Sequence, residues 1–157
     1  MGARLPAVLV VSVAVLAAGA VAASAGGSGK PRTTRLTVTV HTTKLTLVDT
    51  GPTGSSPGDM VLEDDSVTRG GRSAGSAQFT CVAHSGDLAN GNAQCTGTVY
   101  LAQGQIETQG DATSTNGSLS GKGAVTGGTG RYHGVRGSYT FRSTTSTDRV
   151  VRFRLVR

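Results

Sequence analysis

Three consecutive acidic residues, Glu63, Asp64 and Asp65, follow a short apolar run. Carboxyl groups held close together can serve as a general acid or base, because burial and neighbouring charges shift their pKa values toward the working pH. The alternative is a solvated strand end, or a charge partner for Arg131 and Arg136. Both interpretations stay open on the sequence, and Glu63 and Asp65 are the first candidate catalytic residues.

Other kinds of catalytic or cofactor chemistry find little support. The three histidines, His41, His84 and His133, are far apart and lack the spacing of metal ligands, so we expect no metal site. The pair Gly128 and Gly130 lies in a glycine-rich run, but no helix signal follows it, so it is not a dinucleotide-binding fingerprint. We therefore expect no dinucleotide-binding site.

Cys81 and Cys95 are the two cysteines of the chain, and the segment between them has a turn-like centre at Gly86–Gly91. Folding there as a hairpin places the two cysteines opposite each other. An exported chain would oxidise them to a disulfide, which would contribute about 3 kcal/mol to stability in the chain-entropy model. The alternative is a free, reactive Cys81.

The first 25 residues have the pattern of an export signal. Arg4 precedes an uncharged run from Leu5 to Ala23, and Ala23-Ser24-Ala25 forms a small-residue cleavage site before Gly26. We expect cleavage between Ala25 and Gly26, a secreted or extracellular protein, and no stable membrane insertion afterwards. The alternative is a membrane anchor formed by an uncleaved N-terminal helix, since the run is long enough to span a bilayer.

The predicted domains are a signal peptide (1–25), a flexible basic leader (26–35) and one folded domain (36–157). The signal holds 19 apolar residues, whereas only 29% of the other 132 are apolar. That part also contains 22 of the 24 glycines and 22 threonines, both poor helix formers. This composition excludes a helical bundle, a coiled coil and a multi-span membrane protein, and it favours a β domain over a disordered chain.

The alternation of apolar and polar residues predicts eight short strands with no helix between them. Regular short strands are typical of a sandwich or an antiparallel barrel, and eight suffice to close a barrel around one small ligand. A bulge is expected near Thr43-Lys44, where the alternation changes phase. The expected strands begin near Leu36 and then span 59–65, 75–84, 94–101, 104–110, 118–126, 137–143 and 147–156.

Basic residues are concentrated at the C-terminal end, where residues 122–157 carry eight basic and one acidic side chain. Nucleic-acid binding is one interpretation of such an end. However, Arg149, Arg152, Arg154 and Arg157 nearly alternate with apolar residues, which predicts the solvent face of a half-buried strand. No aromatic side chains accompany the arginines to stack bases. We therefore expect no nucleic-acid partner.

The most distinctive stretch runs from Ala124 to Gly137 and reads AVTGGTGRYHGVRG. Its glycines suit a tight crossing between strands. It resembles the glycine-rich signature of the allene oxide cyclase barrel-like superfamily, which includes plant dirigent proteins. The resemblance extends in order through Gly58–Asp59, Leu62–Asp65, Ala77–Cys81, Cys95–Thr98 and Gly104–Gly110.

The resemblance implies an eight-stranded antiparallel β-barrel with a central apolar cavity open at one end. Members of the superfamily steer reactive small molecules through cyclisation, radical coupling or pericyclic ring closure, without a cofactor. The acidic residue after the fifth strand of dirigent proteins matches Asp111, a third candidate catalytic residue. Their first-strand Asp falls on Thr42, and their other polar site positions fall on Cys81, Ala83 and Gly121. The expected ligand contacts are His41, Tyr100 and Tyr139.

Two functional hypotheses follow. The first is a secreted, cofactor-free barrel that binds a small apolar molecule and acts as a cyclase, an isomerase or a dirigent-like protein that steers coupling. The second is a non-catalytic secreted binding or cell-envelope module. Either could form a homo-oligomer. The interior of the barrel separates them, because an interior filled by Leu, Val and Phe without a convergent polar pair would exclude the enzyme.

Overall fold

The computed structural model describes residues 30–87 and 90–157. The predicted signal peptide, its cleavage site at Ala25-Gly26 and most of the basic leader lie outside the described residues. Within the described ranges, no helix has the length and apolar character needed to cross a membrane.

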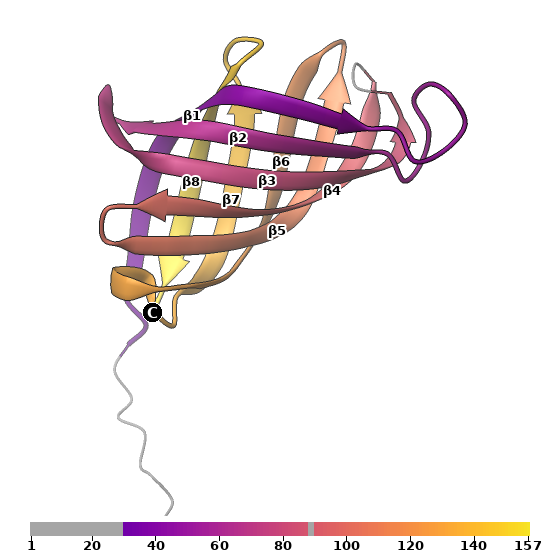
Figure 1. Cartoon of the computed structure of the whole chain (residues 1–157). Helices are drawn as coiled ribbons and strands as arrows, with labels where there is room; N and C mark the ends of the chain where they lie inside the picture. Colours follow the sequence, from indigo (N-terminus) through magenta and orange to yellow (C-terminus); the bar gives the residue numbers. More distant parts are fainter. Residues whose placement is uncertain (1–29, 88–89) are drawn as a thin grey trace, which may run out of the picture.

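The chain forms a closed antiparallel barrel of eight strands in sequence order, and β8 returns to pair with β1 (Figure 1). This confirms the barrel over the sandwich. A 3-10 turn, η1 (Gly130–Tyr132), connects β6 to β7. The strands are β1 (Thr33–Val48), β2 (Met60–Arg69), β3 (Arg72–Gly86), β4 (Gly91–Leu101), β5 (Gly104–Thr115), β6 (Ser118–Gly128), β7 (Arg136–Ser143) and β8 (Asp148–Val156).

Alternating residues point into the barrel, as strand geometry requires. One half of the interior is filled by apolar side chains that are almost fully buried, so that this end of the barrel is solid. Its core includes Leu36, Val38, Val40, Val67, Val99, Ile106, Val125, Phe153 and Leu155. The outward positions of the same strands are largely threonine, serine and arginine.

The predicted bulge in β1 is confirmed, because the register with β2 shifts between Thr42 and Lys44. The extra residue, Thr43, donates its hydroxyl proton to the Asp64 carbonyl oxygen over 2.7 Å. The bulge changes the phase of the strand, and Leu45 and Leu47 therefore face the interior side although they have odd numbers, whereas the inward residues before the bulge have even ones.

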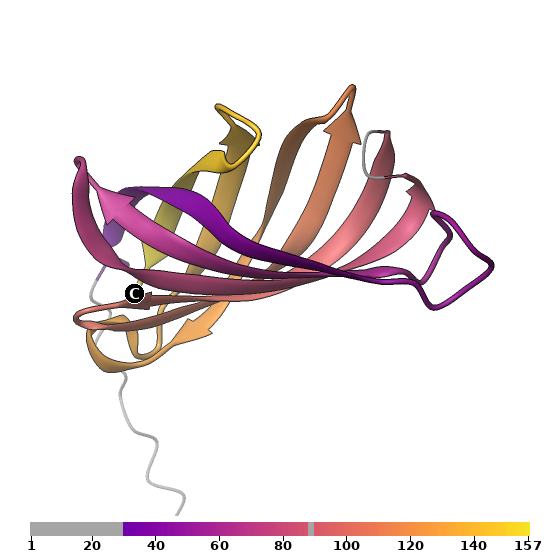
Figure 2. The same cartoon turned by 45° about the horizontal axis from the view of Figure 1, so that its top comes forward.

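The other end of the barrel is open. Strand β1 pairs with β8 only as far as His41 and Asp148, and beyond that point it pairs with β2 alone. The ends of β1 to β4 consequently extend past β7 and β8 as a splayed sheet (Figure 2). Leu45 and Leu47 lie on this extension and are about half exposed.

Strands β2 and β3 form one longer hairpin than predicted. The sequence predicted that the second strand ends at Asp65 and the third begins at Gly75, but β2 continues to Arg69 and β3 begins at Arg72. Gly70 and Gly71 connect them with φ values of 58° and 75°, which suit the two-residue turn that matches the twist of a hairpin. The extension places Asp65 in the middle of a strand.

The disulfide between Cys81 and Cys95 is confirmed, and the alternative of a free Cys81 is wrong. The two residues are direct partners across β3 and β4, with Cα atoms 4.0 Å apart. The hairpin predicted from the intervening segment therefore brings them together. Their sulfur atoms lie on the interior side of the barrel, where Cys95 is buried.

Candidate functional site

An apolar cavity of about 450 Å³ occupies the open end of the barrel. Leu45, Leu47, Val61 and Leu119 contribute to its wall. A smaller apolar pocket of about 40 Å³ lies deeper, against Phe79, Tyr139, Phe141 and Phe153. The two spaces share four lining residues: Cys81, Ala112, Leu119 and Arg149. Arg149 is the charged side chain that reaches both.

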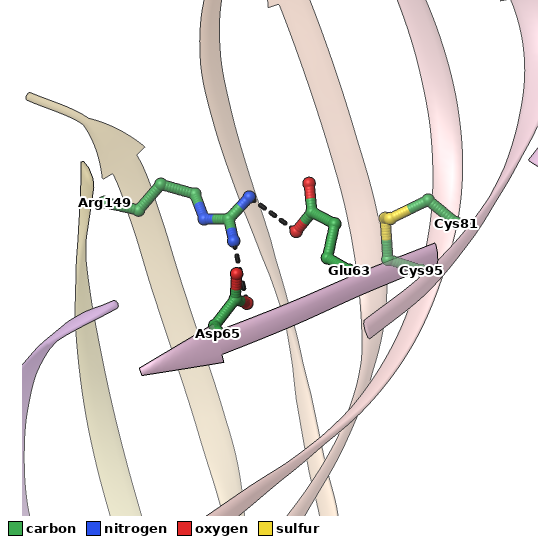
Figure 3. Close-up of a disulfide and its surroundings, with 5 residues drawn as sticks. All are labelled: Glu63, Asp65, Cys81, Cys95 and Arg149. Atoms are coloured by element: carbon green, nitrogen blue, oxygen red, sulfur yellow. Dashed lines mark hydrogen bonds and ion pairs between the residues drawn. A yellow bond between two sulfur atoms is a disulfide. The ribbon is translucent and has the colours of Figure 1, made fainter. Parts of the chain in front are cut away.

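Arg149 holds two inward-facing carboxylates (Figure 3). Its Nη1 lies 2.7 Å from Oε2 of Glu63, and its Nη2 lies 3.0 Å from Oδ2 of Asp65. The same Nη2 donates to the Thr42 hydroxyl over 3.3 Å. The side chains of Arg149, Glu63 and Asp65 are 10%, 9% and 0% exposed, so the cluster is almost dry. The guanidinium carbon also lies 5.6 Å from the centre of the Phe79 ring, a cation–π contact.

Strand periodicity explains why these charged residues are inside. Asp65 has the same parity as the buried Val67 on β2, and Arg149 has the same parity as the buried Val151 on β8. Strand β1 separates the two strands in the sheet order, and its Thr42 is the register partner of Asp65. The guanidinium therefore reaches across the inner surface of β1 to meet the carboxylates.

Two predictions about these charges are wrong. Arg149 was expected on the solvent face of the last strand with Arg152 and Arg154, but only the latter two are exposed. The acidic residues were also considered as partners of Arg131 and Arg136, whose side chains instead donate to the Gln103 side chain and the Val135 carbonyl. A clustered run of arginines suggested one common face, whereas the alternation puts Arg149 on the other.

Burial raises the pKa of Asp65 to about 6, above its ordinary value of 3.8. The Arg149 charge opposes this rise, and the neighbouring Glu63 adds to it. Asp65 Oδ1 is buried and has no hydrogen-bond partner among the described residues. Asp65 therefore keeps its proton to a higher pH than an exposed aspartate does, and it is about half protonated at pH 6.

A sequence profile described as "Allene oxide cyclase barrel like domain" matches residues 34–155, which is most of the chain. The chain belongs to the allene oxide cyclase barrel-like family. No curated protein matches it significantly.

Several solved structures share this barrel. Pyocyanin demethylase is 24% identical, with a TM-score of 0.65 over 78% of this chain and 99% of that one. The Diels Alderase AbmU from Streptomyces koyangensis is 20% identical, with a TM-score of 0.59 over 83% of this chain and 70% of that one. A pterocarpan synthase dirigent protein is 19% identical, with a TM-score of 0.59 over 82% and 86%. At these identities the likeness shows the fold, which supports several chemistries.

The other predicted site residues of this allene oxide cyclase-like barrel do not all face its cavity. Tyr139 does, since it is buried against the deeper pocket, and burial raises the pKa of its hydroxyl. His41 points outward, where its Nδ1 lies 2.7 Å from Asp148 Oδ1. Tyr100 also lies outside and donates to the Gln78 side chain.

Asp111 is exposed on the outer surface of β5, opposite Lys122 on β6, and it does not line the apolar cavity. The structure therefore brings Glu63 and Asp65 together without Asp111. Among the described residues, no group of His, Cys, Asp and Glu is arranged to hold a metal ion.

The raised pKa of Asp65 makes the stability of this allene oxide cyclase-like barrel depend on pH. The folded state binds that proton more tightly than the unfolded state, because the folded pKa is raised. The stability gained from this tighter proton binding is fully present below about pH 4 and is lost as the pH rises through 6. We expect the free energy of unfolding of Asp65→Asn, relative to wild type, to rise by about 2 kcal/mol between pH 4.5 and pH 7.

Urea unfolding at the two pH values measures this difference. Asp64→Asn is the matched control, because Asp64 is the exposed neighbour of Asp65 on the same strand. The difference in free energy of unfolding between Asp64→Asn and wild type should change little with pH. A gap for Asp65→Asn that stays constant from pH 4.5 to pH 7 would contradict the shifted pKa.

Proposed function

We propose that this chain is an exported, cofactor-free barrel that binds a small apolar molecule at its open end and promotes its cyclisation. The observation that carries the proposal is the buried cluster of Arg149, Glu63 and Asp65, with Arg149 on the wall of the apolar cavity. The N-terminal signal pattern supports export.

The cavity supports a small apolar ligand. Its volume of about 450 Å³ is in the range of pockets that enclose drug-sized molecules. The wall at the open end carries leucine, valine and alanine beside serine and aspartate residues. Its apolar part favours one compact conformer of a flexible chain and excludes water. The interior is filled at one end only, and it contains a convergent polar cluster, which supports the enzyme over a barrel with a filled, purely apolar interior.

The polar cluster can supply the chemical activation. A conjugated carbonyl oxygen placed in the cavity would accept a hydrogen bond from Arg149, which is part of the cavity wall. Such a bond withdraws electrons from the adjoining alkene and stabilises the developing charge in a low-dielectric site. A [4+2] ring closure then forms two carbon–carbon single bonds from two π bonds, without a leaving group or a redox partner. The Diels–Alder enzymes among the structural relatives make this reaction class the one we favour.

The experiment uses a synthetic linear triene that carries an electron-poor alkene next to a ketone. We expect the purified protein to accelerate its ring closure over buffer and to favour one stereoisomer, as measured by chromatography on a chiral column with mass detection. A thermal-shift titration with the same compound measures binding separately. Binding without acceleration would reject the cyclase and leave the non-catalytic binding module.

Two substitutions locate the site. Leu47→Glu puts a charge on the cavity wall at a side chain that is 55% exposed, so that folding should be unaffected. Leu62→Glu is the matched control, since Leu62 is 38% exposed but does not line the cavity. We expect Leu47→Glu to need at least ten times more ligand than wild type to reach the same thermal shift. Leu62→Glu should need the same ligand concentration as wild type. Equal losses in the two variants would place the ligand elsewhere.

A further inference from the structure

The outer surface of three adjacent strands, β7, β8 and β1, carries a group of arginines that the cavity does not use. We call this group the basic wall. All of its members are exposed, and each has outward parity on its strand. The basic wall consists of Arg35, Arg136, Arg142, Arg152 and Arg154.

The strand register sets these arginines side by side. Arg35 on β1 is the direct partner of Arg154 on β8, and Arg152 lies two residues before Arg154 on the same strand. Like charges placed directly opposite on neighbouring strands destabilise a sheet. Neighbouring strands of a sheet lie about 5 Å apart, and alternate residues of one strand are about 7 Å apart along the backbone. The sheet thus tolerates a repulsive arrangement that an external array of anions would stabilise.

Little acidic charge offsets the basic wall. Asp148, at the start of β8, is the one acidic residue with outward parity on these three strands, and it is engaged by His41. The ion pairs found in the described part of the chain involve no arginine of the wall. Between the arginines lie hydroxyl side chains: Thr37, Thr39, Ser138 and Thr140. Arginine forks with nearby hydroxyl donors suit phosphate oxygens.

The remaining outward residues narrow the class of partner. No Phe, Tyr or Trp side chain lies at an outward position of these three strands, so the basic wall lacks large rings on which bases could stack. It also has no large apolar side chain to insert between lipids, since Val150 and Val156 are partly buried. The surface is the convex outside of a barrel, with its three strands side by side (Figure 1). It therefore suits a flexible chain that can follow it better than a flat bilayer.

We infer that the basic wall binds a linear polyanion that carries phosphate groups and no bases. This binding surface is on the outside of the barrel, and it works independently of the cavity and of the proposed cyclase. The contacts are electrostatic, so the affinity should fall steeply as salt displaces the protein from the phosphates.

Long-chain inorganic polyphosphate is the probe, and its dissociation constant is measured by titration at low and at physiological salt. The test variant replaces Arg35, Arg152 and Arg154 with glutamine. The matched control makes the same substitution at Lys44, Arg69 and Arg72, which lie on β1 beyond the seam with β8 and at the β2–β3 turn. Both variants lose three positive charges from exposed sites.

We expect the wall variant to bind polyphosphate at least tenfold more weakly and the control variant to change less than threefold. The wall variant should also show a smaller salt dependence, and its melting temperature at low salt should be no lower than that of wild type. An equal loss in the two variants would show that net charge alone acts and would overturn the proposal. Tighter binding to single-stranded DNA or to anionic vesicles than to polyphosphate would overturn it as well.

Discussion

Replacing Arg149 with methionine is expected to lower the free energy of unfolding by about 3–5 kcal/mol. The variant leaves Glu63 and Asp65 buried without their cation, and a buried carboxylate without a partner is costly because it has lost its water. Part of the loss should be recovered at low pH, where protonation removes the uncompensated charges.

Urea unfolding at pH 7 measures the effect. Arg152→Met is the matched control, because Arg152 is exposed on the same strand and should change stability by less than about 0.5 kcal/mol. A second variant keeps the prediction testable if Arg149→Met does not fold. It combines Arg149→Met with Glu63→Gln and Asp65→Asn, and it should be more stable than Arg149→Met alone. If Arg149→Met were as stable as Arg152→Met, the cluster would not be the buried ion pair described above.

Replacing Gly137 with alanine is expected to destabilise the barrel by about 3–5 kcal/mol or to prevent folding. Gly137 is the second residue of β7 and follows the glycine-rich crossing. Its φ of +148° is a conformation that other residues rarely adopt. A Cβ atom there would also collide with the backbone carbonyl oxygen of Arg154 on β8. The backbone of β8 cannot move aside without breaking its hydrogen bonds to β7. The energetic costs of the backbone strain and of the collision therefore add.

Gly127→Ala is the matched control, since it changes a glycine of the same sequence motif. A Cβ atom at Gly127 would meet nothing closer than the Arg136 side chain at 3.8 Å, and φ there lies outside the positive range that other residues avoid. We expect that variant to keep wild-type stability within about 1 kcal/mol. Thermal unfolding followed by circular dichroism compares the two, and similar melting temperatures would contradict the assigned role of Gly137.

The sequence alone supported much of the fold, because alternation of apolar and polar residues is a local signal. Eight strands, the bulge near Thr43 and the disulfide are all confirmed. The strand ends were less predictable. Ser66 to Arg69 continue β2 with Val67 as the one apolar residue, and the pairing with β3 shows that the strand goes on.

The sequence predicted part of the site. Glu63 and Asp65 were noticed as a cluster, but their partner, Arg149, comes from a strand 84 residues away from Asp65 along the chain. The signal that could have found it is parity: Arg149 precedes Val151, Phe153 and Leu155 at alternate positions, all buried. Conversely, Asp111 precedes the buried Ala112, and the same rule puts its side chain outside. The alternation of inward and outward residues could not show how the strands are staggered around the barrel. That stagger places Arg149 and Asp65 at the same height along the barrel axis.

The order of the strands also determines when the barrel can form. Seven of its eight pairings join neighbours in the sequence, but the last joins β1 to β8, across almost the whole domain. Local hairpins can form early at small entropic cost, whereas this seam must wait until the C-terminal strand is available. Until then two strand edges remain open to pairing with other chains. A chain shortened by β8 should therefore aggregate rather than persist as a smaller barrel, and the Arg149 cluster is completed by the last strand to arrive.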